Sequence, residues 1–186
     1  MKGLSSLTLD LGCGYRKRGD VNIDIRKKVK PTVIADVHYI PFKNRTFDVI
    51  CCFEVIEHVI SPFKLLSESY RVLRDTGKFI LSTPNPYFWR KIAKTILFGR
   101  AYAARDHIST FTMPVIENLF KKIGLIIESM NYSETPWASV YFKNNKFKDS
   151  VIPIRALGMR QLLVTAHTRE NDHIARAQPL RSIDPR

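Results

Sequence analysis

The stretch from Leu7 to Gly14 reads LTLDLGCG, a short apolar run that ends in a Gly-x-Gly turn. Runs of this length are typical of buried parallel strands. Glycine lets the backbone approach a ligand closely, because it has no Cβ and adopts positive φ. The stretch therefore predicts a strand followed by a ligand-binding turn. Lys17 stands where a dinucleotide fingerprint has its third glycine, and Asp10 precedes the first glycine by two residues, so the pattern favours an adenosyl ligand other than NAD.

Further β-rich runs on both sides of this turn predict a doubly wound, mainly parallel α/β sheet. The expected strands are Leu7 to Leu11, Val21 to Ile25, Thr32 to Ala35, Phe47 to Phe53, Lys78 to Thr83, Leu125 to Met130 and Gln161 to Ala166.

Three helices are expected among these strands. Ser61-Pro62 supplies an N-cap and a first-turn proline, and Asp75-Thr76-Gly77 is expected to stop the helix that follows. A second helix runs from Met113 to Ile123 and is ended by Gly124. Tyr87 to Ala104 forms a basic amphipathic segment.

The composition bounds the class of protein. The chain has 186 residues, of which 45% are hydrophobic and 25% charged, which suits one packed domain and excludes collagen, coiled coil and low-complexity disorder. The net charge of +13 favours anionic partners. Three cysteines without paired spacing indicate reduced thiols and a cytoplasmic location. No apolar stretch reaches the roughly 18 residues of a membrane span, so neither secretion nor a transmembrane anchor is expected.

Carboxylates follow two of the expected strands. Asp24 ends the second strand, where an acidic side chain can accept hydrogen bonds from both ribose hydroxyls. Asp36 follows the third strand, within reach of an adenine amine through its side chain or the Val37 amide. The alternative for each is a solvated loop carboxylate.

Five ordered elements resemble a class I S-adenosylmethionine-dependent methyltransferase, most like the type 11 family. They are LDLGCG, the Asp24 strand end, Ala35-Asp36, FDVICCFEVIEHV (residues 47–59), and the turn LRDTGK (residues 73–78) before FILSTPNP (residues 79–86). The resemblance covers roughly residues 7–85, with a weaker echo in 107–124. It implies a Rossmann-like fold and S-adenosylmethionine as cofactor, with S-adenosylhomocysteine as product.

The resemblance also implies where the cofactor binds. The implied cofactor-binding residues are Asp10, Gly12, Cys13 and Gly14 around the methionine and ribose, Asp24 on the ribose hydroxyls, Asp36 and Val37 beside the adenine, and Phe53 and Glu54 on the methionine side.

Two departures from the family concern the first crossover and the N-terminus. Only Tyr15 to Gly19 lie between Gly14 and Asp20, so this crossover is a loop or one turn, although parallel strands usually need about a dozen connecting residues. Barely six residues precede the first strand, where the family has a covering helix. The site is therefore expected to be open, or closed by the basic insert. Seven cations from Arg16 to Lys30 either hold an anion or form a basic surface loop.

Methyl transfer from a sulfonium mainly needs alignment and exclusion of water, so no metal site is expected. A base is needed where the acceptor atom loses a proton. His58 is the first candidate, with Glu57 and His107 beside it. The alternative is that these groups only hold the loops in place.

The sequence predicts one methyltransferase domain over residues 1–167, with a lid or acceptor insert at 85–112 and a polar C-terminal tail at 168–186. The acceptor is expected to be a small molecule, a glycan or a lipid-linked compound, including anionic ones, methylated on O, N or C. The insert could also contact a membrane surface, or simply pack as a lid helix. RNA methylation and a noncatalytic S-adenosylmethionine-binding scaffold are the alternatives.

Overall fold

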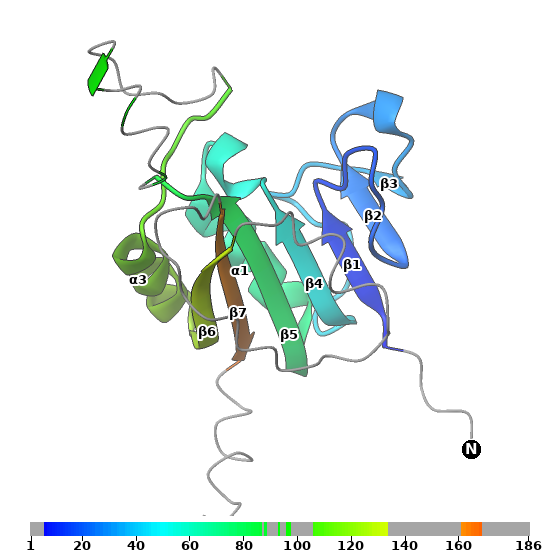
Figure 1. The fold of residues 1–186 in the computed structure, drawn as a ribbon. Coiled ribbons are helices and arrows are strands. Elements are labelled where there is room, and N and C mark those ends of the chain that lie inside the picture. The colour runs from blue at the N-terminus through cyan, green and yellow to red at the C-terminus, as the bar shows by residue number, and fades with distance from the viewer. Residues whose placement is uncertain are drawn as a thin grey trace, which may run out of the picture.

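The computed structural model describes residues 6–86, 88, 93, 96–97, 106–133 and 161–168. Within these residues, seven strands form one sheet in the order β3-β2-β1-β4-β5-β7-β6 (Figure 1). The strands are β1 (Thr8–Leu11), β2 (Val21–Asp24), β3 (Val33–Ile34), β4 (Phe47–Phe53), β5 (Leu73–Pro84), β6 (Leu125–Ser133) and β7 (Gln161–Thr168). β7 runs antiparallel to β5 and β6, and the other neighbouring pairs are parallel. This arrangement confirms the predicted Rossmann-like, mainly parallel sheet.

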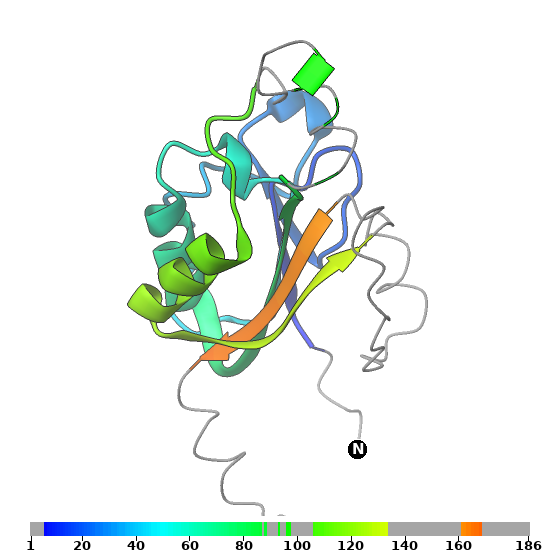
Figure 2. The same cartoon turned by 60° about the vertical axis from the view of Figure 1, so that its left-hand side comes forward.

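The described helices cover one face of the sheet. Helix α1 (Pro62–Val72) and helix α3 (Met113–Ile123) lie side by side on that face (Figure 2). The Ser61 hydroxyl caps α1 by accepting a hydrogen bond from the Lys64 amide at 3.3 Å. Gly124, with φ +92°, closes α3 in the left-handed conformation. Two short 3-10 turns, η1 (Lys27–Val29) and η2 (Ile56–His58), follow β2 and β4.

The main hydrophobic core lies between the sheet and these two helices. Alternate residues of the central strands enter it, as their period of two requires. Phe79 of β5 packs against Phe120 of α3, with ring centroids 5.9 Å apart. A smaller cluster of Cys51, Phe53, Ile80 and Leu163 belongs to the opposite face. Cys51 and Cys52 are both buried, and burial raises the pKa of the Cys51 thiol to about 12, so neither is an activated nucleophile.

The first crossover is as short as the sequence predicts. Residues 12–20 join β1 to β2 without a helix, yet the two strands pair in parallel. Nine residues suffice because β1 and β2 pair over only three positions, so the loop travels back a short distance. It runs beside β1: the Thr8 amide donates to Asp20 Oδ2 at 2.8 Å, and a Cβ at Gly19 would lie 2.7 Å from the Thr8 carbonyl oxygen.

The predicted stop of the first helix was wrong in detail. Helix α1 ends at Val72, and β5 begins at once with Leu73, which pairs with Phe47. The next pair is Val49 with Lys78, so residues 74–77, including Asp75-Thr76-Gly77, form an irregularity inside β5 instead of a turn before it. Most of the predicted insert at 85–112 and the tail beyond Thr168 lie outside the described residues. Among the described helices, none has the length and apolar character needed to cross a membrane.

Candidate active site

A cavity of about 600 Å³ opens at the carboxyl ends of the parallel strands, a volume typical of small-ligand sites. Ligands bind at this edge of open α/β sheets. The cavity is lined by six of the residues predicted from the sequence, namely Gly12, Asp24, Asp36, Val37, Glu54 and His58. The remaining lining residues are Ile25, Arg26, Ala35, His38, Val55, Val59, Ile60 and Asp106. The other predicted residues, Asp10, Cys13, Gly14, Phe53, Glu57 and His107, are outside this lining.

The glycine turn after β1 can be formed only by glycine. Gly12 and Gly14 have φ of +62° and +56°, the left-handed region that side chains disfavour. A Cβ at Gly12 would also lie 2.4 Å from Val55 Cγ2. The Cys13 amide between them donates to the Ile23 carbonyl at 3.0 Å, while its side chain is buried. The turn is thereby held against β2 with its backbone at the cavity wall.

Asp24 is held rigidly at the end of β2. Its side chain is buried, and its Oδ2 accepts a hydrogen bond from the Gly14 amide at 2.9 Å. Arg26 donates to both carboxylate oxygens, from Nε at 3.0 Å and from its terminal nitrogen at 3.0 Å. Burial would raise the pKa of Asp24, but the hydrogen bonds from Arg26 and Gly14 outweigh it and hold the pKa below its ordinary value. Asp24 is therefore ionised at the cavity wall.

Asp36 and His38 form a second polar wall. Asp36 Oδ1 accepts from the His38 amide at 2.9 Å and lies 2.6 Å from His38 Nδ1. The Ser61 amide donates to His38 Nε2 at 3.3 Å, so the ring proton lies on Nδ1 and faces Asp36. Burial acts to raise the pKa of Asp36, but these hydrogen bonds from His38 lower it overall.

Asp10 lies beneath the first crossover loop. Its Oδ2 accepts from the Arg18 amide at 2.9 Å, and the Arg18 guanidinium lies 3.7 Å away and 5.0 Å from the centre of the Phe53 ring. Burial raises the pKa of Asp10 to about 6, against the opposing effect of Arg18. Among the described residues, Asp10 Oδ1 is a buried oxygen that accepts no hydrogen bond.

The end of β4 is strained where it meets the cavity. Glu54 adopts φ +54°, which is costly for a residue with a side chain and is common at functional sites. Its backbone amide donates to the Ser82 carbonyl, and its Oε1 accepts from the Ser82 hydroxyl, both at 3.0 Å. Glu54 is thus fixed between the carboxyl ends of β4 and β5.

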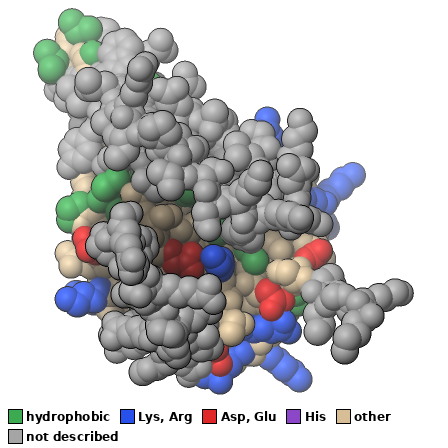
Figure 3. Space-filling view, turned by 60° about the horizontal axis from the view of Figure 1, so that its bottom comes forward, with side chains coloured by type: hydrophobic (Ala, Val, Ile, Leu, Met, Phe, Trp, Pro, Cys, Tyr) green, Lys and Arg blue, Asp and Glu red, His purple; other side chains and the backbone are tan. Residues whose placement is uncertain are grey.

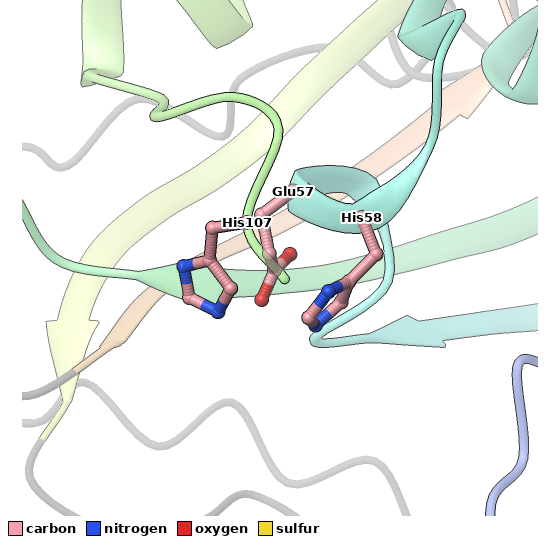
Figure 4. Close-up of side chains that lie close together, drawn as sticks. All are labelled: Glu57, His58 and His107. Carbon is pink, nitrogen blue, oxygen red and sulfur yellow. The ribbon is translucent and has the colours of Figure 1, made fainter. Parts of the chain in front are cut away.

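The three candidate catalytic residues are brought together, although only His58 lines the cavity. Figure 4 shows the Glu57 carboxylate between the imidazoles of His58 and His107. One ligand atom from each lies within 4.8 Å of the others, and the two rings are nearly perpendicular, with centroids 4.8 Å apart. Two backbone amides, Ile108 at 2.8 Å and Ser109 at 3.2 Å, donate to the Glu57 carbonyl and fix the loop of His107 against η2.

Three polar residues of the lining, Arg26, His38 and Asp106, were not predicted as site residues from the sequence. Arg26 was counted only within a basic run, and His38 and Asp106 were not singled out. His38 sits two residues after Asp36, a local spacing that could have suggested the pair. Asp106 touches the site only because the chain folds back over η2, so no local pattern indicates it.

The arrangement suits S-adenosylmethionine. The glycine turn leaves room for a ligand, Asp24 is an ionised acceptor, and Asp10 offers a buried oxygen without a donor. Among the described residues, the lining also holds four carboxylates, Asp24, Asp36, Glu54 and Asp106, against one arginine. Such walls favour a positively charged ligand despite the +13 charge of the chain.

Comparisons with known proteins agree with this geometry. The family profile described as a methyltransferase domain matches residues 6–129, about two thirds of the chain. An uncharacterized protein of Methanocaldococcus jannaschii is 36% identical over 106 residues, which are 49% of this chain and 42% of that protein. A probable S-adenosylmethionine-dependent methyltransferase of Mycolicibacterium smegmatis is 31% identical over 96 residues, 41% of this chain and 37% of the relative. The chain thus matches about two fifths of the length of each.

A crystal structure of a Thermotoga maritima S-adenosylmethionine-dependent methyltransferase, described as a possible histamine N-methyltransferase, shares the fold. Its TM-score is 0.66 at 12% identity, and the match covers 89% of this chain and 83% of that one. The sequence match, the strand order and the turn after β1 lead to one conclusion. The chain belongs to the methyltransferase-domain family, and it shares its fold with S-adenosylmethionine-dependent methyltransferases of known structure.

Proposed function

We propose that this protein transfers the methyl group of S-adenosylmethionine to an oxygen, nitrogen or carbon atom of a small-molecule, glycan or lipid-linked acceptor. The observation that carries the proposal is the cavity at the strand ends, which is lined by the Gly12 turn, the ionised Asp24 and His58 together. The cofactor supplies a methyl group already activated by the positive charge on sulfur. The protein residues then have to bind, orient and exclude water.

The cofactor half of the cavity is assigned as follows. The Gly12-Cys13-Gly14 backbone and Asp10 hold the methionine and ribose part, with Phe53 and Glu54 on the methionine side. Asp24 accepts hydrogen bonds from the ribose hydroxyls. To allow this, the Arg26 guanidinium has to release one or both oxygens of the Asp24 carboxylate. It can do so, because the Arg26 side chain is 52% exposed. Asp36 and Val37 flank the adenine.

The acceptor half is assigned to the ends of β4 and β5. His58, which lines the cavity, is assigned as the first candidate base for an O–H or N–H acceptor, with Glu57 and His107 beside it as the other candidates. His58 Nδ1 lies 3.0 Å from the Asp106 carbonyl, to which it donates, so Nε2 carries the lone pair. This fixes the tautomer needed to receive a proton or to bind an electrophile.

RNA is a second candidate acceptor because of the charge. Exposed cations follow β1 and β2, including Arg16, Lys17 and Lys27. Figure 3 shows lysines and arginines interspersed with acidic side chains on the viewed face. This mixture argues against a continuous basic track for nucleic acid there. An RNA complex that survives about 0.2 M salt would favour this second acceptor class, because nonspecific phosphate contacts weaken steeply with salt.

Calorimetric titration tests the proposal. Purified protein is titrated with S-adenosylmethionine and S-adenosylhomocysteine, with NAD as the control ligand. We expect binding of both sulfur compounds, no binding of NAD, and clearly weakened binding in Asp24→Ala. Transfer of labelled methyl to candidate acceptors follows. No cofactor binding by the unaltered protein would refute the proposal, and binding without transfer to any acceptor would favour the scaffold alternative.

A further inference from the structure

We infer that Glu57, His58 and His107 together bind one divalent ion of the first transition series, and that the methyl acceptor is a hydroxyl compound whose oxygen this ion polarises. The second half of this inference rests on the proposed methyl-transfer function, whereas the first half does not. One carboxylate and two imidazoles supply ligand atoms that all lie within 4.8 Å of one another. From the sequence, these three residues were expected to serve as candidate bases or to hold the loops in place.

The cluster is held together by backbone hydrogen bonds between the two segments that carry it. Glu57 and His58 come from η2, directly after β4, and His107 comes from the segment before α3. The two segments are joined by the paired amides of Ile108 and Ser109 on the Glu57 carbonyl. Figure 4 shows both rings and the carboxylate directed toward a common space.

Neighbouring groups orient the ligands as they do in metal sites. The His58 Nδ1–H donates to the Asp106 carbonyl at 3.0 Å, which leaves Nε2 as the coordinating nitrogen. Glu57 is 1% exposed, and its Oε2 accepts from the Thr83 hydroxyl at 3.3 Å. Metal-bound histidines and carboxylates commonly carry such outer hydrogen bonds, which fix the ring and raise ligand basicity.

The ligand set selects the class of ion. Two imidazole nitrogens and one carboxylate oxygen suit Zn²⁺, Co²⁺, Fe²⁺ or Mn²⁺, whereas Mg²⁺ and Ca²⁺ prefer oxygen alone. Ligand bonds of about 2.0–2.2 Å place neighbouring ligand atoms of a tetrahedral ion about 3.3–3.6 Å apart, so the three side chains have to approach one another by about 1 Å on binding the ion. The His58 side chain, 34% exposed, can close the remaining gap by a small rotation.

Three protein ligands leave coordination positions for other molecules, as in catalytic metal sites. His58 and Asp106 line the cavity that also contains Gly12 and Asp24, so an acceptor bound to the ion would lie beside the cofactor half. A cation lowers the pKa of a hydroxyl that it coordinates. The acceptor proton passes to water, a new O–CH₃ bond forms, and the electron pair of the broken S–CH₃ bond returns to sulfur, leaving a neutral thioether.

Metal titration of the tag-free, chelator-treated full chain tests the site. Co²⁺ is added with visible absorption as the readout, and Zn²⁺, Mn²⁺ and Mg²⁺ are titrated calorimetrically. We expect one Co²⁺ or Zn²⁺ per chain, and affinity lower by about tenfold or more in His107→Gln and in His58→Gln. Mg²⁺ should bind more weakly than Mn²⁺. His167→Gln, in β7 beside Glu128, is the matched histidine control and should bind like the unaltered chain.

Circular dichroism of each variant verifies folding. If His107→Gln does not fold, His58→Gln serves as the second variant, because the His58 side chain is one-third exposed. Absence of stoichiometric metal binding, or equal affinity in the folded His58 and His107 variants, would overturn the site. Tighter Mg²⁺ than Mn²⁺ binding would overturn the assigned ion class. S-adenosylhomocysteine titration of the same samples separates the two proposals. Cofactor binding without metal binding refutes the metal site and leaves the proposed function standing. Metal binding without cofactor binding refutes the proposed function, together with the role of the ion toward the acceptor, and leaves the metal site standing.

Discussion

The two halves of the site are built in different ways. The centre of the cofactor half is local: the Gly12 turn, Asp24 and Arg26 all come from one strand-loop-strand unit, and Gly14 contacts Asp24 directly. The acceptor half depends on distant contacts, since His58 meets Asp106 across 48 residues. A substitution in the first half should therefore act on cofactor binding, and one in the second half on the reaction with the acceptor.

The largest effect is expected at the glycine turn. Gly12→Ala should weaken S-adenosylhomocysteine binding by about 100-fold, because positive φ costs about 1–3 kcal/mol and the new Cβ meets Val55 Cγ2 at 2.4 Å. Gly14→Ala has similar φ, but its Cβ would meet only Arg26 at 3.7 Å, so its effect should be smaller.

The double variant Gly12→Ala with Val55→Ala separates the two causes by calorimetry. Removing the valine methyls should recover part of the lost affinity. Equal affinities for the Gly12 and Gly14 variants would contradict the close approach at Val55.

The next largest effect on cofactor affinity is expected at Asp24, and it should be opposite in sign to the effect at Arg26, which pairs with Asp24. Asp24→Asn should weaken cofactor binding by about tenfold or more, because hydrogen bonds to a charged group are worth about 1.5–3 kcal/mol. Arg26→Ala should tighten binding by about threefold, because it frees the carboxylate that the ribose uses. Both are measured with S-adenosylhomocysteine, and a large loss of affinity in Arg26→Ala would show that Arg26 contacts the ligand instead.

A third effect concerns stability, through Asp10. Its pKa is raised in the folded state, from 3.8 to about 6, so the folded state holds the proton more tightly than the unfolded state. This residue therefore lowers the free energy of unfolding as pH rises from about 4 to 6, by up to roughly 3 kcal/mol. Asp10→Asn should stabilise the ligand-free protein at pH 7 by about 1–2 kcal/mol.

The measurement is urea unfolding at a series of pH values. The variant should lose the fall in stability between pH 4 and 6 that Asp10 contributes. If the stability of Asp10→Asn at pH 7 is unchanged or lower, the folded protein stabilises the ionised Asp10 carboxylate better than its burial indicates.

The smallest effect is expected where the two halves meet, at Glu54 on the methionine side of the cofactor. Ser82→Ala removes the hydroxyl that donates to Glu54 at 3.0 Å, a hydrogen bond worth about 1 kcal/mol. Methyl transfer should slow by about threefold while S-adenosylhomocysteine affinity changes less. Ser129→Ala, whose hydroxyl pairs with Thr165 in the β6–β7 pair, is the control and should leave both quantities unchanged.

The contrast between the halves also explains what the sequence could predict. Strand identity and the shortened crossover were predictable because buried runs and glycine turns are local signals. The bulge at residues 74–77 was not, because strand pairing between Leu73 and Phe47 overrides the turn propensity of Asp75-Thr76-Gly77. Arg26 and Asp106 were missed since their roles arise from side-chain pairing and from chain folding, which spacing does not encode.

A crystal structure of the chain with S-adenosylhomocysteine tests the central claim most directly. The account predicts the ligand in the cavity at the ends of β1, β2 and β4, with the ribose hydroxyls on Asp24 and the Arg26 guanidinium moved away from at least one carboxylate oxygen. A ligand bound elsewhere, or a ribose that does not contact Asp24, would contradict it.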